Sequence, residues 1–455
     1  MKQNKGFLKS VCALAIPVAL QSMLQASFSI VDQIMIGSLG SVQIAGVGIA
    51  GKFSSIYTVV VSAIGAVAGI MISQYMGQKN KYEIRRSFYL NLMFAVLLAG
   101  MFTAVCFAFP LGIMSLYTKD PLTQTAAGEY LFIIAGTFLP VAGATLLSTM
   151  LRCMEKAHLP LVASIVAAVL NTGLNYILIF GKFGIAPMGA KGAALATLVS
   201  QIANLLIMLA FMIGSRAELS KDGTEKKKSP FNTKQYAHML LPILVCELLW
   251  SLGENVYAAI YGHMGTDASA AMTLINPVQG LMIGALCGLS QAAGVIVGKK
   301  LGSGEYEDAY SASKKLILYG FVGSAVLSCV VLATCGVYVE IYNVEDAVKL
   351  LTKHILIAYA VVAPFKVLNM ILGGGIIRSG GETKYVMIID IIGTWGFGVP
   401  LGLLSAFVLG LSVPWVYFIL SLEECVRFGI SLFVFKRKNW MHRLKASDNP
   451  KDVQG

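Results

Sequence analysis

Long, uninterrupted apolar segments constrain this chain more than any other feature. Twelve of them, most about 20 residues or longer, recur along the sequence. Only helices and closed barrels can cross a bilayer, because its hydrocarbon core has no water to satisfy exposed backbone groups. A spanning helix needs about 20 apolar residues, whereas a barrel strand needs about ten of alternating character. The segments therefore predict an all-α polytopic membrane protein with spans near 11–36, 45–73, 87–110, 127–150, 160–180, 192–213, 238–262, 269–298, 314–337, 350–374, 384–407 and 413–435.

The composition and the placement of basic residues agree with this prediction. Hydrophobic residues make up 56% of the chain and charged residues 13%, whereas soluble domains are about 25% charged. Of the 35 Lys and Arg residues, 27 lie in the termini and in every second loop, and 5 lie in the alternate loops. Cytoplasmic loops carry the excess of basic residues. We therefore expect a multi-pass protein of the plasma (cytoplasmic) membrane with both termini cytoplasmic, and we expect no nucleic-acid partner despite the net charge of +12.

The sequence contains no signature of nucleotide binding, hydrolysis or metal clusters. It has no GxxxxGK[ST], HExxH or GxSxG motif. Its eight cysteines include no CxxC pair and fall mostly in apolar segments, as small hydrophobic residues do. We therefore expect a protein that is not an enzyme and has no cofactor besides a coupling ion.

The two halves of the chain repeat each other. With a shift of 225 residues, helix-breaking and loop positions coincide: Pro17 with Pro242, Gly37 with Gly262, Gly40 with Gly265, Gly69 with Gly294 and Gly77 with Gly302. Arg152 coincides with Arg378 at a shift of 226. Six spans per repeat is an even number, so both copies enter the membrane in the same orientation, as parallel repeats do. Two pseudo-symmetric six-helix bundles facing each other would leave a cleft between them.

These repeats predict the domain organisation. We expect an N-terminal six-helix lobe at 1–213, a cytoplasmic linker at 214–236, a C-terminal six-helix lobe at 237–436 and a cytoplasmic tail at 437–455.

The first span carries one acid, Asp32, deep in its second half. An acid in this position costs about 2.5–3.5 kcal/mol on insertion scales and usually marks a functional site. Because residues four and seven apart share a helix face, Gln21, Gln25 and Phe28 lie on the Asp32 face. We interpret this face as the lining of a cavity, with Asp32 binding the ion and the other three contacting substrate. The alternative is a structural Asp32 that a neighbouring helix satisfies.

The repeat places a second polar face on the seventh span. Asp32 corresponds to Tyr257, and the residues on the equivalent face are Glu247, Trp250 and Glu254. We expect Glu247 to take part in ion coupling, and Trp250, Glu254 and Tyr257 to contact substrate. Aromatic rings and carboxylates together suit an organic cation, since cation–π attraction adds about 2 kcal/mol when desolvated. Purely structural roles for the two glutamates are the alternative.

Other polar residues inside spans suggest partners for these groups. Asn171 and Asn175 share a face of the fifth span and can bond the Asp32 carboxylate or join helices. If Na⁺ is the coupling ion, Asp32, Asn171 and Asn175 would be its ligands. In the second half, Lys366 is expected to pair with Asp390.

A further ion pair is expected within the last span. Arg427 lies one turn after Glu423 and Glu424, so a local pair with one of these acids is expected.

Three stretches resemble the multidrug and toxic compound extrusion (MATE) family: IPVALQSMLQASFSIVDQIMIGSLGSVQIAGVGI at 16–49, MLRCMEKAHLPLVASIVAAVLNTGLNYILIFGKFGIAPMGAKGAALATLVSQ at 150–201 and RSGGET at 378–383. The resemblance implies twelve helices in two lobes and efflux of mostly cationic compounds in exchange for H⁺ or Na⁺. It maps the family's first-span acid onto Asp32 and its paired fifth-span residues onto Asn171 and Asn175. Some members have an acid at the second of these positions, where this chain has Asn175.

We therefore expect a secondary antiporter that exports amphipathic organic cations in exchange for H⁺ or Na⁺ by alternating access of two lobes. Its partners would be small-molecule cations and the lipid bilayer, and it would be a monomer. One alternative is a flippase of the related lipid-linked oligosaccharide class, which would need a more basic cleft. Another is a membrane sensor or assembly subunit that transports nothing and shows no ion-dependent ligand binding.

Overall fold

The structure is a computed structural model that describes residues 2–220, 233–342 and 344–444, and the side chains of 6–215, 234–342 and 344–444. Much of the expected linker (214–236) and most of the expected tail (437–455) lie outside the described residues. No described residue is in a strand. In chain order the helices are α1 (Lys2–Gly37), α2 (Ser41–Gly77), α3 (Lys81–Ala108), α4 (Pro110–Ser115), α5 (Pro121–Ala135), α6 (Phe138–Cys153), α7 (His158–Phe180), α8 (Ala190–Ser220), α9 (Thr233–His263), α10 (Thr266–Ser303), α11 (Tyr306–Glu340), α12 (Asp346–Asn369), η1 (Met370–Ile377), α13 (Thr383–Asp390), η2 (Ile391–Gly398), α14 (Val399–Leu403), η3 (Leu404–Val408), α15 (Val413–Ser421) and α16 (Glu423–Arg437).

These helices confirm the all-α polytopic fold. In the described residues, ten helices are long and apolar enough to cross a membrane, and the α5–α6 pair, bent by 45°, makes an eleventh. The twelfth predicted span is also helical but is divided at Leu422 into α15 and α16. It carries three charged residues, Glu423, Glu424 and Arg427.

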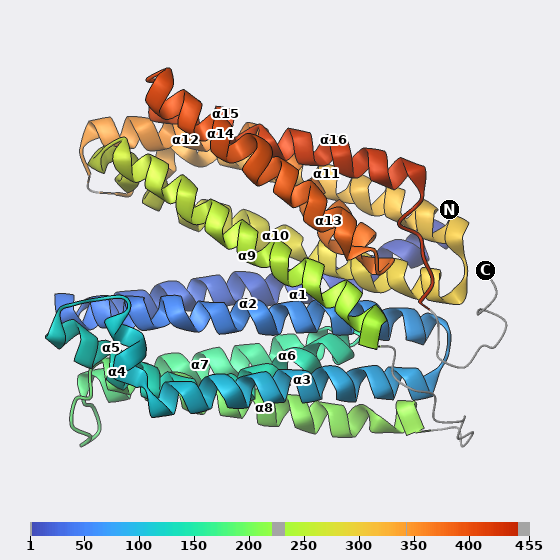
Figure 1. Cartoon of the computed structure of the whole chain (residues 1–455), viewed down its shortest axis with the longest axis horizontal. Helices are drawn as coiled ribbons and strands as arrows, with labels where there is room; N and C mark the ends of the chain where they lie inside the picture. The colour runs from blue at the N-terminus through green and yellow to red at the C-terminus, as the bar shows by residue number, and fades with distance from the viewer. Residues whose placement is uncertain (1, 221–232, 343, 445–455) are drawn as a thin grey trace. The chain divides into compact units, whose positions relative to one another are not determined.

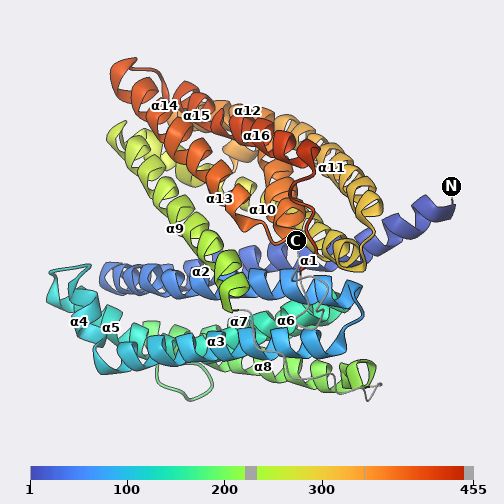
Figure 2. The same ribbon diagram turned by 45° about the vertical axis from the view of Figure 1, so that its right-hand side comes forward.

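The chain forms two compact units. One consists of Leu20–Ile72 and Asn80–Lys228. Within it α3 packs against α6, and α8 packs against α5, α6 and α7, so that the long helices run side by side in both views (Figures 1 and 2). Tyr57 of α2 is buried in this unit, where it stacks on Phe138 with ring centroids 4.3 Å apart.

The other unit consists of Met1–Ala19, Ser73–Lys79 and Ser229–Gly455. Within it α10 packs against α11, α12 and η1, and α9 lies beside α13 (Figures 1 and 2). Its apolar core includes Tyr257, Ile275, Ile355, Tyr359 and Val416. Three consecutive glycines, Gly373–Gly375, lie in η1, where the helix widens to π-type geometry; such turns often occur at functional sites.

Backbone geometry confirms the internal repeat. Left-handed residues end equivalent helices in the two halves, at Gly40 and Gly265, at Lys79 and Gly304, and at Glu155 and Gly381. The first two pairs are 225 residues apart and the third is 226 apart, as the sequence comparison predicts. Such conformations are uncommon outside glycine, so their recurrence at matched positions supports duplication of one six-helix unit.

Large apolar side chains face outward along the spanning helices. They include Leu97 and Met101 of α3, Leu206 and Ile213 of α8, and Val326 of α11, all of which are exposed. A water-soluble protein rarely exposes so many such groups together. These outer faces are therefore suited to contact with lipid.

Candidate functional site

The Asp32 carboxylate is held by two amides from another helix. Asp32 lies in α1, and the Nδ2 atom of Asn175 in α7 donates a hydrogen bond to its Oδ1 over 2.7 Å. In the orientation that satisfies both of its amide atoms, Asn171 donates to the two Asp32 oxygens over 3.0 and 3.2 Å. Its Oδ1 then accepts a hydrogen bond from Thr197 Oγ1 of α8 over 3.3 Å. Three helices thus position one half-buried acid.

The Asp32 cluster, which consists of Asp32, Asn171, Asn175 and Thr197, has oxygen atoms that could bind a positive charge. Among the described residues, Asn175 Oδ1 is buried and has no hydrogen-bond partner. Carboxylate, amide and hydroxyl oxygens are the ligands of hard cations, and the carboxylate is also a proton acceptor. The cluster can therefore hold either a proton or a small cation, with amide donors stabilising the ionised form of Asp32 when the site is empty.

The predicted partners of Asp32 on its own helix lie in different surroundings. Gln21 is buried and engaged, because it accepts from Arg152 Nη2 over 2.9 Å and donates to Ser164 Oγ over 2.7 Å. Gln25 is exposed and Phe28 is half-buried. The structure thus brings Asn171 and Asn175 to Asp32, and its hydrogen bonds tie Gln21 to Arg152 and Ser164.

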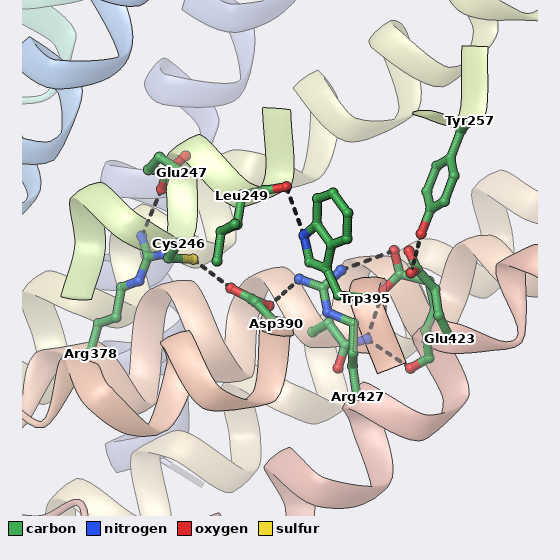
Figure 3. A network of polar contacts seen from close by, with 11 residues as sticks. Cys246, Glu247, Leu249, Tyr257, Arg378, Asp390, Trp395, Glu423 and Arg427 are labelled. Carbon is green, nitrogen blue, oxygen red and sulfur yellow. Dashed lines mark hydrogen bonds and ion pairs between the residues drawn. The ribbon is translucent and has the colours of Figure 1, made fainter. Parts of the chain in front are cut away.

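The second half builds the same contact from the equivalent positions. Cys246, Arg378 and Asp390 correspond to Gln21, Arg152 and Ser164 at shifts of 225 or 226. The Cys246 thiol donates to Asp390 Oδ2 over 2.6 Å and accepts from Arg378 Nη2 over 3.3 Å. Figure 3 shows this arrangement extended by Glu247, which pairs with Arg378 over 3.2 Å. Each half therefore keeps its arginine, but the neutral Gln21 and Ser164 of the first half are replaced by Cys246 and the acid Asp390 in the second.

The network of charged side chains in the second half extends to the last helix. Arg427 of α16 pairs with Asp390 (Figure 3). It also pairs with Glu424 Oε1 over 3.6 Å. The predicted pairing of Arg427 with an acid one turn earlier is confirmed. The predicted pair of Lys366 with Asp390 is wrong, because Arg427 and Cys246 occupy that carboxylate.

A cavity of about 420 Å³ lies beside this network, inside the same unit. It is lined by aromatic, acidic and basic side chains: Tyr257, Tyr261, Tyr359, Tyr417, Glu254, Glu423, Glu424 and Lys366. The Tyr257 hydroxyl donates to Glu423 Oε2 over 2.5 Å (Figure 3). A neighbouring cavity of about 330 Å³ is lined by Glu247, Trp250, Arg378 and Arg427, among others. Lys366 and Glu424 line both cavities.

The four residues predicted on the seventh span are therefore divided between two cavities. Glu254 and Tyr257 line the larger one, and Glu247 and Trp250 line the smaller one. Sequence reasoning missed Thr197 and treated Glu423 only as a possible partner of Arg427. For Glu423 the available signal was its charge within an apolar span, because such residues usually mark a functional site.

Comparisons with known proteins agree with this architecture. The MatE family model matches the chain twice, at residues 17–177 and 242–404. A probable multidrug resistance protein NorM of Thermotoga maritima is 25% identical over 447 residues, covering 96% of this chain and 93% of the relative. The multidrug resistance protein MdtK of Yersinia enterocolitica is 24% identical over 461 residues, covering 96% of each chain.

A solved structure shares the fold. The crystal structure of a MATE protein in the bent conformation superposes with a TM-score of 0.84 at 19% identity, covering 96% of both chains. The double match of the family model falls on the two halves that the repeat and the left-handed turns define. The chain is thus a multi-pass membrane transporter and belongs to the MatE family.

Proposed function

We propose that this protein is a secondary antiporter that exports amphipathic organic cations in exchange for H⁺ or Na⁺. The two lobes would expose the substrate alternately to each side of the plasma membrane. Relatives named as multidrug resistance proteins support an efflux role. Neither the family model nor these relatives favour the flippase alternative.

The observation that carries the proposal is the Asp32 cluster. A carboxylate in an apolar spanning helix is costly unless it binds something. Here Asn171 and Asn175 stabilise the ionised state, and Asn175 Oδ1 is free to serve an incoming cation. Loading of this cluster with H⁺ or Na⁺ would neutralise Asp32 and allow the first lobe to change conformation.

The substrate would bind in the larger cavity of the C-terminal unit. Its volume of about 420 Å³ is within the range typical of small-molecule sites, roughly 300–1,000 Å³. Four tyrosines offer ring faces to an aromatic cation, and Glu254 and Glu423 offer negative charge. We further propose that both termini lie in the cytoplasm, as the distribution of basic residues among the loops predicts. We also propose that the protein is a monomer.

The experiment is uptake of a fluorescent cation into proteoliposomes against imposed gradients. A pH gradient and a Na⁺ gradient are applied separately, and the gradient that drives uptake identifies the coupling ion. Asp32→Asn should abolish gradient-driven uptake while the protein remains folded and inserted. Asp267→Asn, which removes an exposed acid from the first turn of α10, is the matched control and should transport normally. Undiminished uptake by Asp32→Asn would refute the proposal.

A further inference from the structure

Lys366 is a basic residue in the last turn of α12, just before this spanning helix continues into η1. Its neighbours in sequence are Phe365 and Val367, and its side chain lines both cavities of the C-terminal unit. Placing an ammonium group in a spanning helix is costly, and such residues usually pair with an acid or serve a ligand. Its location at the junction of two cavities is therefore the feature to explain.

The two arginines beside Lys366 have counter-ions, and Lys366 does not. Arg378 pairs with Glu247, and Arg427 pairs with Asp390 and Glu424. Across the part of the chain that the structure describes, no carboxylate oxygen lies within 4.0 Å of Lys366 Nζ. Lys366 and Glu423 are close enough for their charges to interact, but they form no ion pair.

Three acids line the larger cavity, and one of them, Glu424, pairs with Arg427. Glu423 accepts a hydrogen bond from the neutral Tyr257 hydroxyl. Within the described residues, neither Glu254 nor Glu423 has a basic group within 4.0 Å. One cavity is thus lined by an ammonium group and two carboxylates that have no ion-pair partner among the described residues, and also by four tyrosines.

We propose that this cavity binds amphipathic zwitterions, with Lys366 as the residue that recognises their anionic group. The ligand's carboxylate would pair with Lys366, its ammonium group with Glu254 or Glu423, and its aromatic body with the tyrosines. A compound with only a cationic group would leave Lys366 unpaired and would therefore bind less tightly. This inference rests on the proposed function, because it narrows the substrate class of the same cavity.

A structural role for Lys366 makes a different prediction. If Lys366 only moderates the negative charge of Glu423 from a distance, its loss should affect cationic and zwitterionic ligands alike, or should favour both. Recognition of an anionic group requires that only the zwitterion be affected. A pair of probes that differ in one carboxylate separates these roles.

The experiment uses Nε-dansyl-lysine, a fluorescent zwitterion, and its methyl ester, which is a cation. Both are titrated into the purified full-length protein in lipid nanodiscs without any ion gradient. The wild-type protein should bind the acid more tightly than the ester. Lys366→Met should weaken binding of the acid by roughly tenfold to a hundredfold, as expected for loss of one charge-assisted hydrogen bond. It should leave ester binding unchanged or tighter.

Two further variants sharpen the result. Lys366→Arg keeps the charge and should keep the preference for the acid. Lys353→Met removes an exposed lysine from the same helix, outside both cavities, and should bind as the wild type does. A wild-type protein that binds the ester as tightly as the acid, or that binds neither, would overturn the inference without involving any variant. An equal loss of affinity for both probes in the Lys366→Met variant would also overturn it.

Failure here and failure of the proposed function are separate results. Binding is measured without a gradient, whereas ion-driven exchange is measured by the Asp32 experiment. A transporter that exchanges cations and ignores the carboxylate would keep its proposed function and lose this inference.

Discussion

The ion pair between Arg427 and Asp390 allows a quantitative test of the charged network. The side chains of Arg427 and Asp390 are only 12% and 13% exposed, and that of Glu424 is 6% exposed. Replacing Arg427 by Met leaves both acids without their basic partner. Removing one member of a buried pair costs about 3–5 kcal/mol, whereas exposed pairs contribute about 0–1 kcal/mol. Because Arg427 lines a cavity that water can enter, we expect the lower limit, about 3 kcal/mol.

The assay is the free energy of unfolding of the purified full-length protein in mixed micelles. Asp390→Asn and the double variant complete a cycle, in which the pair should show a coupling of about 1–3 kcal/mol. Lys438→Met is the control: its pair with Glu307 is 39% and 82% exposed, so its loss should cost about 1 kcal/mol or less. Strictly additive effects of the two substitutions, or a loss for Arg427→Met as small as that of the control, would refute the reasoning.

Three further predictions concern a buried hydroxyl, a helix cap and the membrane topology. Tyr57→Phe should destabilise the protein by about 1–2 kcal/mol in the same unfolding assay, because the buried hydroxyl donates to a backbone carbonyl at the start of α6 over 2.5 Å. Hydrogen bonds from the side chain and the backbone of Thr123 hold the pKa of Asp120 below its ordinary 3.8. Asp120 is the N-cap residue of α5. Its ionised carboxylate should therefore stabilise the first turn of α5 at pH values above 3.8, and this stabilisation should be lost as the pH falls through the lowered pKa. Amide exchange in the first turn of α5 should follow this acid dependence in the wild type and not in Asp120→Asn, whose cap does not titrate. For topology, Lys182→Cys should react with an impermeant thiol reagent applied outside, and Ser303→Cys only after permeabilisation; the opposite pattern would reverse the proposed orientation.

Spacing along single helices predicted one part of the site well. Asn171 and Asn175 lie four residues apart and therefore share a face, and the structure directs both at Asp32. The repeat also predicted that Tyr257 occupies the position equivalent to Asp32, within the polar face of the seventh span. These inferences needed only helical periodicity and a constant shift between the halves.

Partners from other helices could not be predicted in the same way. Periodicity states which residues share a face, but it does not state which helix that face meets. Asp390 was therefore assigned to Lys366, although packing of α13 against α16 places Arg427 at its carboxylate. For the same reason, the hydrogen bond from Tyr257 to Glu423 became visible only in the folded unit.

The most direct test of the account is whether a drug gradient can move the coupling ion through Asp32. Proteoliposomes are loaded with an organic cation, and its downhill exit is followed together with the internal concentration of H⁺ or Na⁺. We expect drug exit to drive ion entry in the wild type and to drive none in Asp32→Asn, with drug binding retained. Ion entry coupled to drug exit in the Asp32→Asn variant would contradict it.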